Sequence, residues 1–215
     1  FSTGMLVMGL DRFRQQLWAH LSARFPNERS VWGLHMVAAM LFQTADTPPS
    51  AAELAENYMI WLRLSVAEHQ RLEAMLMHHR HPAFEGGADV DPLTAHRFWF
   101  RLGVAGVDVC LFMLARVQAE EGVRINQDAW ITRVARVRGL LDAYFMQHDT
   151  IVNPPLLLDG KALMQALGLT SGPLIGELIT LIREAQASGE AKTIEDALTL
   201  ARVYLNHHSD KSNNR

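Results

Sequence analysis

The chain has 215 residues, of which 20% are charged and 49% are apolar, and its formal net charge is −3 at pH 7. This length suffices for a full hydrophobic core, and the balanced charge excludes a general attraction to polyanions, so any nucleic-acid contact requires a local basic face. The single cysteine, Cys110, excludes an internal disulfide and agrees with a reducing compartment. We find no signal peptide and no apolar run near about 18 residues, so we expect a cytoplasmic protein that does not span a membrane.

The first two thirds of the sequence predict helices. Apolar residues recur at intervals of three and four, without sustained strand-like alternation. The early series are Leu10, Phe13, Leu17 and Leu21, then Val31, Leu34, Ala38 and Leu41, then Leu54, Tyr58 and Leu62. A capping box from Ser65 to Glu68 marks one helix start. Asp91 before Pro92, and Asn126 before a further apolar series, mark two more. The sequence therefore predicts an all-α fold.

The chain is expected to leave this helical body around Asn153-Pro154-Pro155, because two prolines restrict themselves and the residue before them. Glycines divide the C-terminal region into short helices. Helices are expected from Asp159-Gly160 to Gly168, from Ser171-Gly172-Pro173 to Gly189, and after a cap at Thr193 to Asp196. We therefore divide the chain into segment 1–90, a helical body 91–152, a compact tail domain 153–208 and a polar, disordered end 209–215.

A cluster of histidines, His78, His79 and His81, precedes Pro82. Neighbouring histidines are a common source of metal ligands, but a metal-dependent hydrolase also needs carboxylates beside them. The nearby carboxylates are Glu73, Glu85 and Asp89, and none forms a tight His-Asp doublet. The spacing leaves two interpretations open: a metal site, or the end of a helix, where partly cationic side chains suit the negative end of the helix dipole.

The segment from Asn153 to Gly176 reads NPPLLLDGKALMQALGLTSGPLIG, and residues Arg183 to Leu198 continue with REAQ, GE, T and EDAL. It resembles the C-terminal part of the bacterial CCA-adding enzyme and poly(A) polymerase family, with its proline pair and its "dGxdLm-alGl-pGPxiG" pattern. Two glycines, a proline and the intervening apolar positions fall in register. Upstream, Phe98 to Asp108 is similar to the family's "rff-r-gdaGvdll" helix pair. The resemblance is strongest from Leu93 to Leu205.

The front third resembles the His-Asp (HD-type) helical domain that some members of this family carry. Trp18-Ala-His20 stands where such domains show "vWeHt", and His78-His79 matches their "vrhH-rp" run. Their metal-binding doublet is replaced by Phe42-Gln43, and neither side chain is a good ligand for a divalent ion. Where active members show a late aspartate, this chain has arginine. The resemblance thus implies an HD-like bundle without a metal, whose remnants are His20, Phe42, Gln43, His78, His79 and Arg116.

Nucleotide addition in this family requires a head domain with a Gly-Ser loop and an Asp-x-Asp pair that holds two magnesium ions. Asp89-Val-Asp91 has that spacing but leads directly into a helix that begins with proline, so we interpret it as a polar loop with a helix cap. We therefore expect no catalytic residue and no cofactor in this chain; Mg²⁺ and a nucleoside triphosphate would belong to such a head. The full-length parent would be a nucleotidyltransferase of the CCA-adding or poly(A) type.

The resemblance implies that this chain is an RNA-binding body and tail, with tRNA or another structured RNA as partner. The candidate contacts are Arg97, Arg101, Arg133, Arg136, Lys161 and the turn at Ser171 and Gly172. The arginines after Asn126 lie off the apolar face, which fits either a solvated helix face or a phosphate-contacting edge. Gly172 could let a phosphate approach free helix amides, or the tail glycines could serve only turns and close packing. The acidic balance of the tail predicts modest electrostatic affinity.

Two other functions stay open. An HD-type metal-dependent phosphohydrolase is motivated by His20, His78 and His79. A non-catalytic helical interaction module is motivated by the lost doublet and the acidic tail. The sequence does not specify an oligomeric state.

Overall fold

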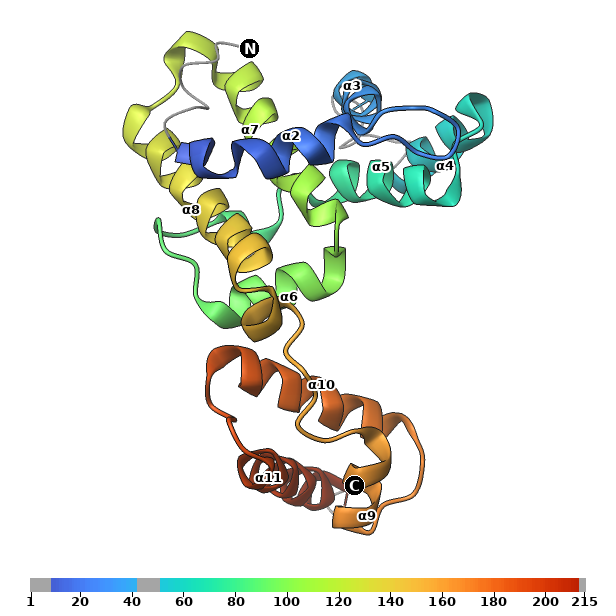
Figure 1. Cartoon of the computed structure of the whole chain (residues 1–215), viewed down its shortest axis with the longest axis vertical. Coiled ribbons are helices and arrows are strands. Elements are labelled where there is room, and N and C mark those ends of the chain that lie inside the picture. Colours follow the sequence, from blue (N-terminus) through green and yellow to red (C-terminus); the bar gives the residue numbers. More distant parts are fainter. Residues whose placement is uncertain (1–8, 42–50, 213–215) are drawn as a thin grey trace. The chain divides into compact units, whose positions relative to one another are not determined.

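The computed structural model describes residues 9–41 and 51–212, and Figure 1 shows that this part of the chain is built from helices. The only extended pairing within it is an isolated antiparallel bridge between Arg24 and Ser30. The predicted all-α class is confirmed. Contacts divide the chain into two compact units: Phe1–Val90 with Arg101–Leu141, and Asp91–Phe100 with Asp142–Arg215. The division into segment 1–90, body 91–152, tail domain 153–208 and end 209–215 stays a prediction.

The first unit contains most of the helices of the chain. They are η1 (Asp11–Phe13), α2 (Arg14–Ser22), α3 (Val31–Leu41), α4 (Ala51–Leu62), α5 (Val66–His78), η3 (Pro82–Phe84), α7 (Ala105–Glu121), η4 (Gly122–Arg124) and the larger part of α8 (Gln127–Met146). α5 is the central element, because it packs against α3, α4 and α7. Its apolar face is fully buried through Leu72, Met75 and Leu76. This packing fixes which side chains of α5 and α7 face one another.

The second unit contains most of α6 (Pro92–Leu102), the π-helix η5 (His148–Val152), α9 (Gly160–Leu167), α10 (Pro173–Ser188) and α11 (Ile194–Ser212). Its tail helices enclose a core of Leu158, Leu163, Leu178, Ile182, Ala197 and Ala201. His96 Nδ1 lies 2.7 Å from the carbonyl oxygen of Ile151, which ties α6 to η5. A bidentate pair joins α6 to α10, with Arg97 Nε 2.8 Å and Nη2 2.6 Å from the two carboxylate oxygens of Glu184.

The helix starts expected from the sequence are present. The capping box of Ser65 and Glu68 is complete, and Asp91 Oδ1 accepts from the Thr94 amide at 2.8 Å, as expected of a cap in the Asp89-Val-Asp91 loop. Asn126, Asp159 and Thr193 likewise accept from backbone amides three residues later, at 3.0, 2.7 and 3.1 Å. α9 and α10 end at Gly168 and Gly189, whose φ values of 65° and 81° favour glycine.

No single helix among the described residues is long and apolar enough to cross a membrane. Within residues 9–41 and 51–212, one bent pair of helices, α6 and α7, passes a test of length and composition. α7 is largely buried within this protein, as its side chains from Ala105 to Cys110 show.

Candidate functional site

The carboxylate of Asp108 on α7 is buried in the first unit, and cationic and histidine side chains surround it. Asp108 is 0% exposed, and Arg71 of α5 holds both of its oxygens, with Nε 2.5 Å from Oδ2 and Nη2 2.8 Å from Oδ1. His20 Nε2 of α2 lies 2.7 Å from Oδ1. Arg71 also stacks over Phe25, with its guanidinium carbon 5.4 Å from the ring centroid. A charge-balanced network therefore joins α2, α5 and α7.

A second histidine, His35 of α3, borders this network. Its Nδ1 lies 3.1 Å from the Val31 carbonyl oxygen, which an N–H at that position satisfies. Its Nε2 lies 3.6 Å from Asp108 Oδ1 and has no hydrogen-bond partner in the described part of the chain. Burial lowers the pKa of His35 below its usual value, although the Asp108 carboxylate opposes this effect. His35 is therefore a neutral side chain at neutral pH.

The pKa of Asp108 is set by opposing effects. Burial raises it, but the hydrogen bonds from His20 and Arg71, together with their charges, outweigh burial and hold the pKa below its usual value. The carboxylate is thus ionised and neutralised by an internal guanidinium. Across residues 9–41 and 51–212, no group of three or more His, Cys, Asp or Glu side chains could hold a metal ion.

The structure places the expected HD remnants in different surroundings. His20 belongs to the Asp108 network, whereas His79 is buried with its ring edge-on to Phe112 at 6.3 Å between centroids. His78 is the last residue of α5, and its ring lies 5.8 Å from that of His81. Arg116 forms an ion pair with Glu120 one turn away. Phe42 and Gln43 lie outside the described residues. The assignment as a degenerate HD site stays a prediction.

A helix ends at the histidines before Pro82, as one of the two interpretations expected, but the lowered pKa values of His78 and His81 do not fit the partly cationic side chains of that interpretation. α5 ends at His78, and His81 caps the short η3 helix by accepting from the Ala83 amide at 3.0 Å. Burial, followed by the charge of Arg101, lowers the pKa of His78. Burial, followed by the charges of His78 and Arg101, lowers the pKa of His81. Arg101, one of the candidate RNA contacts, therefore lies near these two rings.

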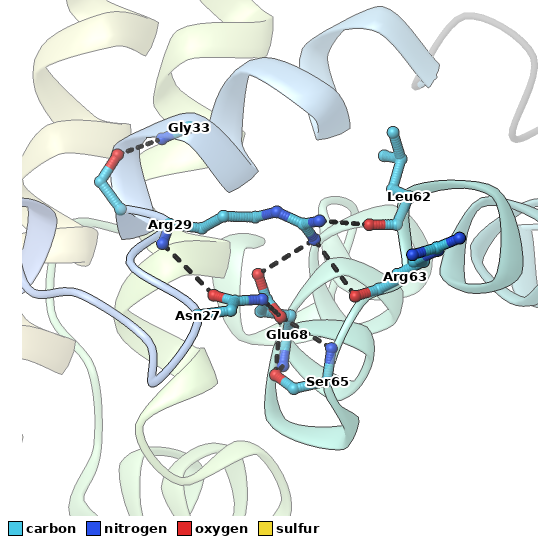
Figure 2. Close-up of polar contacts among 8 residues, drawn as sticks. Asn27, Arg29, Gly33, Leu62, Arg63, Ser65 and Glu68 are labelled. Atoms are coloured by element: carbon cyan, nitrogen blue, oxygen red, sulfur yellow. Dashed lines mark hydrogen bonds and ion pairs between the residues drawn. The ribbon is translucent and has the colours of Figure 1, made fainter.

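A second polar cluster surrounds Glu68, which is also 0% exposed (Figure 2). Its Oε2 accepts from Asn27 Nδ2 at 2.8 Å and from the amide and hydroxyl of Ser65 at 2.7 Å each. Its Oε1 lies 3.5 Å from Arg29 Nη1. Burial raises the pKa of Glu68, but the hydrogen bonds from Ser65 and Asn27 and the Arg29 charge lower it overall. Arg29 also donates to the carbonyl oxygens of Leu62 and Arg63, where α4 ends.

The candidate RNA-contacting arginines have different environments. Arg136 departs from both expectations for its helix, because it is only 8% exposed and donates to the carbonyl oxygens of Ala83, Gly87 and Asp89 at 2.6, 2.9 and 2.7 Å. Arg133 lies 2.9 Å from Glu121, and Arg97 is held by Glu184. Their guanidinium groups serve internal contacts in this structure.

The remaining candidates are exposed. These are Arg101 in the first unit, and Lys161, Ser171 and Gly172 in the second. A Cβ added at Gly172 or Gly176 would meet nothing within 4 Å, so close packing inside the described chain does not require glycine there. Gly172 has an extended backbone, with φ of 172°, and caps α10 without a side-chain bond.

Sequence reasoning did not single out the residues that organise both clusters. Asp108, Arg71 and His35 come from helices far apart in the chain, with 88 residues separating His20 from Asp108. Glu68 was identified only as part of a capping box, which accounts for its Ser65 contacts but not for those with Asn27 and Arg29. A charged residue at a core-facing position of a helix is the local signal that could have identified Asp108.

The thiol of Cys110 is expected to be inert in the native protein. Burial, with a smaller effect of the Asp108 charge, raises the pKa of this fully buried thiol well above its usual value. Iodoacetamide at pH 8 should therefore leave native protein unmodified and alkylate it fully in urea, as read by intact mass. Rapid alkylation of the native protein would contradict the buried position.

Comparison with known proteins gives two relatives. An A-adding tRNA nucleotidyltransferase from Deinococcus radiodurans is 32% identical over 151 residues, which cover 68% of this chain and 32% of the relative. A CC-adding tRNA nucleotidyltransferase from Thermus thermophilus is 28% identical over 150 residues, covering 68% of this chain and 30% of the relative. The chain thus aligns with about a third of the length of these proteins. No protein-family profile and no solved structure gives a significant match. The resemblance stated from the sequence is confirmed: the chain contains a region homologous to A-adding and CC-adding tRNA nucleotidyltransferases.

Proposed function

We propose that this chain is an RNA-binding region of a tRNA nucleotidyltransferase-type protein, with tRNA or another structured RNA as its partner. The observation that carries the proposal is the alignment of 68% of the chain with two enzymes whose names both specify tRNA. The proposal assigns RNA holding to this chain and leaves nucleotide addition to a catalytic head of the kind that the family resemblance implies.

Arg101 and Lys161 are the side chains that best support RNA contact. Both are exposed, and neither has an ion-pair partner in the described part of the chain. Ser171 and Gly172 add an exposed helix start at α10, where open space beside Gly172 leaves room for a phosphate. Arg97 and Arg133 rank second as contacts. Each is already paired with a carboxylate, and a phosphate would have to compete with it. Arg136 is left out of the contact set, since its donors are bound to backbone carbonyls.

The proposal predicts salt-dependent binding of folded tRNA. Because neutralised phosphates release counterions, the logarithm of affinity should fall linearly with the logarithm of salt concentration. Arg101→Gln is expected to weaken binding at low salt and to reduce the slope by about 1. Fluorescence anisotropy with labelled tRNA over a salt series would measure both quantities.

The matched control is Arg14→Gln, which removes an exposed arginine that is paired with Asp11 at 2.6 Å. This control should leave the slope unchanged. A folded, monodisperse sample that binds no tRNA at low salt would overturn the proposed function.

One observation favours the interaction-module alternative. α3 has no charged residue, and Trp32, Met36 and Met40 lie one turn apart on it with 46%, 52% and 80% of their surface exposed. A stoichiometric protein complex together with no detectable RNA affinity would favour this alternative over RNA binding.

A further inference from the structure

A cavity of about 360 Å³ lies beside the Glu68 cluster in the first unit. Its apolar walls come from α3, through Gly33, Leu34 and Val37, and from the junction of α4 and α5, through Leu62 and Leu64. Arg29 and Ser30 form its polar edge. A volume of this size lies at the lower end of the range for small-molecule sites, which begins at about 300 Å³.

Hydrogen bonds hold the polar edge of the cavity, and its unused groups are donors. Arg29 is held by the carbonyl oxygens of Leu62 and Arg63 and by Glu68, as Figure 2 shows, while its Nε–H makes no hydrogen bond within the described residues. Ser30 Oγ accepts from the Gly33 amide at 3.0 Å, which leaves the hydroxyl hydrogen available. Glu68 is buried, and its carboxylate holds the Arg29 side chain in place. A ligand at this edge must therefore present acceptors.

The backbone beside the cavity is held in an uncommon conformation at two places. Glu28 and Arg63 have φ values of 65° and 51°, and in the described part of the chain no other non-glycine residue has a positive φ. Glu28 precedes Arg29, and Arg63 lies between Leu62 and Leu64, so both adjoin lining residues. Non-glycine residues in this region are uncommon and cluster at ligand-binding sites.

Arg63 adjoins two lining residues of the cavity, Leu62 and Leu64, in the chain. Arg63 is exposed, and its guanidinium has no ion-pair partner within the described residues. Figure 2 shows its carbonyl directed at Arg29 and its guanidinium directed away from the Glu68 cluster. An apolar interior and a donor edge, with an exposed arginine next to the lining residues in the chain, fit a flat base with acceptor atoms on a phosphate-bearing chain. An apolar protein side chain would use only the walls.

We infer that this cavity receives one unstacked nucleobase of the bound RNA. The acceptor edge of the base faces Arg29 Nε and the Ser30 hydroxyl, and Arg63 contacts a phosphate next to it. Proteins commonly recognise RNA through splayed bases, which stack on side chains and form hydrogen bonds through their edges. This inference rests on the proposed function and adds a base-binding site to it.

The direct test is a titration of ¹⁵N-labelled protein with each of the four nucleoside 5′-monophosphates, and with ribose 5-phosphate as a probe that lacks a base. Amide shifts at Gly33, Leu34 and Val37 are expected with at least one nucleotide and absent with ribose 5-phosphate. Equal shifts with ribose 5-phosphate would overturn the assignment of a base to the cavity.

Two variants fill the cavity to different extents. Val37→Phe places a large ring among the lining residues and should weaken tRNA binding about tenfold, because it removes the space for one base. Gly33→Ala adds a Cβ only 3.4 Å from Ser30 Oγ and should weaken binding less, while helix propensity keeps this variant folded. Val66→Phe, at an exposed position outside the lining, is the matched control.

The phosphate contact proposed for Arg63 is tested with Arg63→Asn, because asparagine tolerates the positive φ at this position. It should weaken tRNA binding more than Arg124→Asn, which removes another exposed arginine. Failure of the unmodified chain to bind tRNA overturns the proposed function. Unchanged tRNA affinity in both folded cavity variants, beside normal binding by the unmodified chain, overturns only the base-binding site.

Discussion

Asp108→Asn is expected to lower the free energy of unfolding by about 3 kcal/mol, because it leaves the Arg71 cation without its counter-ion in a buried position. Asp108 is fully buried, and the Arg71 side chain is only 12% exposed, so water cannot replace the lost charge. Asparagine preserves the shape of the side chain, which separates the loss of charge from the creation of a cavity. Urea unfolding at pH 7 followed by circular dichroism would measure the difference.

The control for this prediction is Asp89→Asn, which changes an exposed aspartate and should alter stability by less than about 0.5 kcal/mol. Adding Arg71→Met to Asp108→Asn should recover part of the loss, because the unpaired cation is then removed. If Asp108→Asn unfolds at the same urea concentration as the unmodified chain, the network contributes no net stability.

The same network predicts how stability depends on pH. The folded-state pKa of Asp108 lies below its unfolded value of about 3.9, so its contribution is complete above that pH and is lost as pH falls through the folded-state pKa. The folded-state pKa of His35 is also lowered, so the unfolded chain binds its proton first and stability begins to fall below about pH 6.5. Asp108→Asn should reduce the loss at the lower pH and leave the part that Glu68, whose pKa is also lowered, contributes.

Arg136→Ala is expected to destabilise the first unit by about 3 kcal/mol, through loss of charged hydrogen bonds to three buried or half-buried carbonyl groups. The guanidinium holds the loop between η3 and α6 against α8. Gly86, whose φ is 101°, comes close to it, since a Cβ there would lie 3.4 Å from Arg136 Nη1. Thermal unfolding of Arg136→Ala and Arg136→Lys would measure the effect.

Substitution of Arg136 by lysine separates the effect of its charge from the effect of its hydrogen bonds. Arg136→Lys keeps the charge but cannot reach three carbonyl oxygens with a planar fork, so it should recover little stability. Arg138→Lys, on the exposed side of the same helix, is the matched control and should be neutral. Full stability of Arg136→Lys would show that charge alone holds the loop.

The helices were predictable because their signals are local. Caps such as Ser65, Asp91 and Asp159 act on amides three residues away, and Gly168 and Gly189 end helices through their own backbone conformation. The same locality made a helix end one of the two interpretations of the histidines before Pro82. These parts of the fold follow from neighbouring residues alone.

The candidate sites depend on packing and were less predictable. Periodicity places Arg136 off the apolar face of α8, but it contains no information on the loop that covers this arginine. The partners of Asp108 lie 37 and 88 residues away, so no local spacing relates them. Asn27 and Arg29 reach Glu68 across 41 and 39 residues in the same way. The family resemblance identified His20 but not Arg71, which contacts the same Asp108 carboxylate.

The discontinuity of the first unit has a consequence for synthesis on the ribosome. Phe1–Val90 and Arg101–Leu141 belong to that unit, whereas the stretch between them belongs to the other. Arg71 therefore emerges well before Asp108, and its charge has no buried partner until α7 has left the exit tunnel. Because chains fold as they are made, the N-terminal helices stay incomplete and open to chaperones until about two thirds of this sequence has been translated.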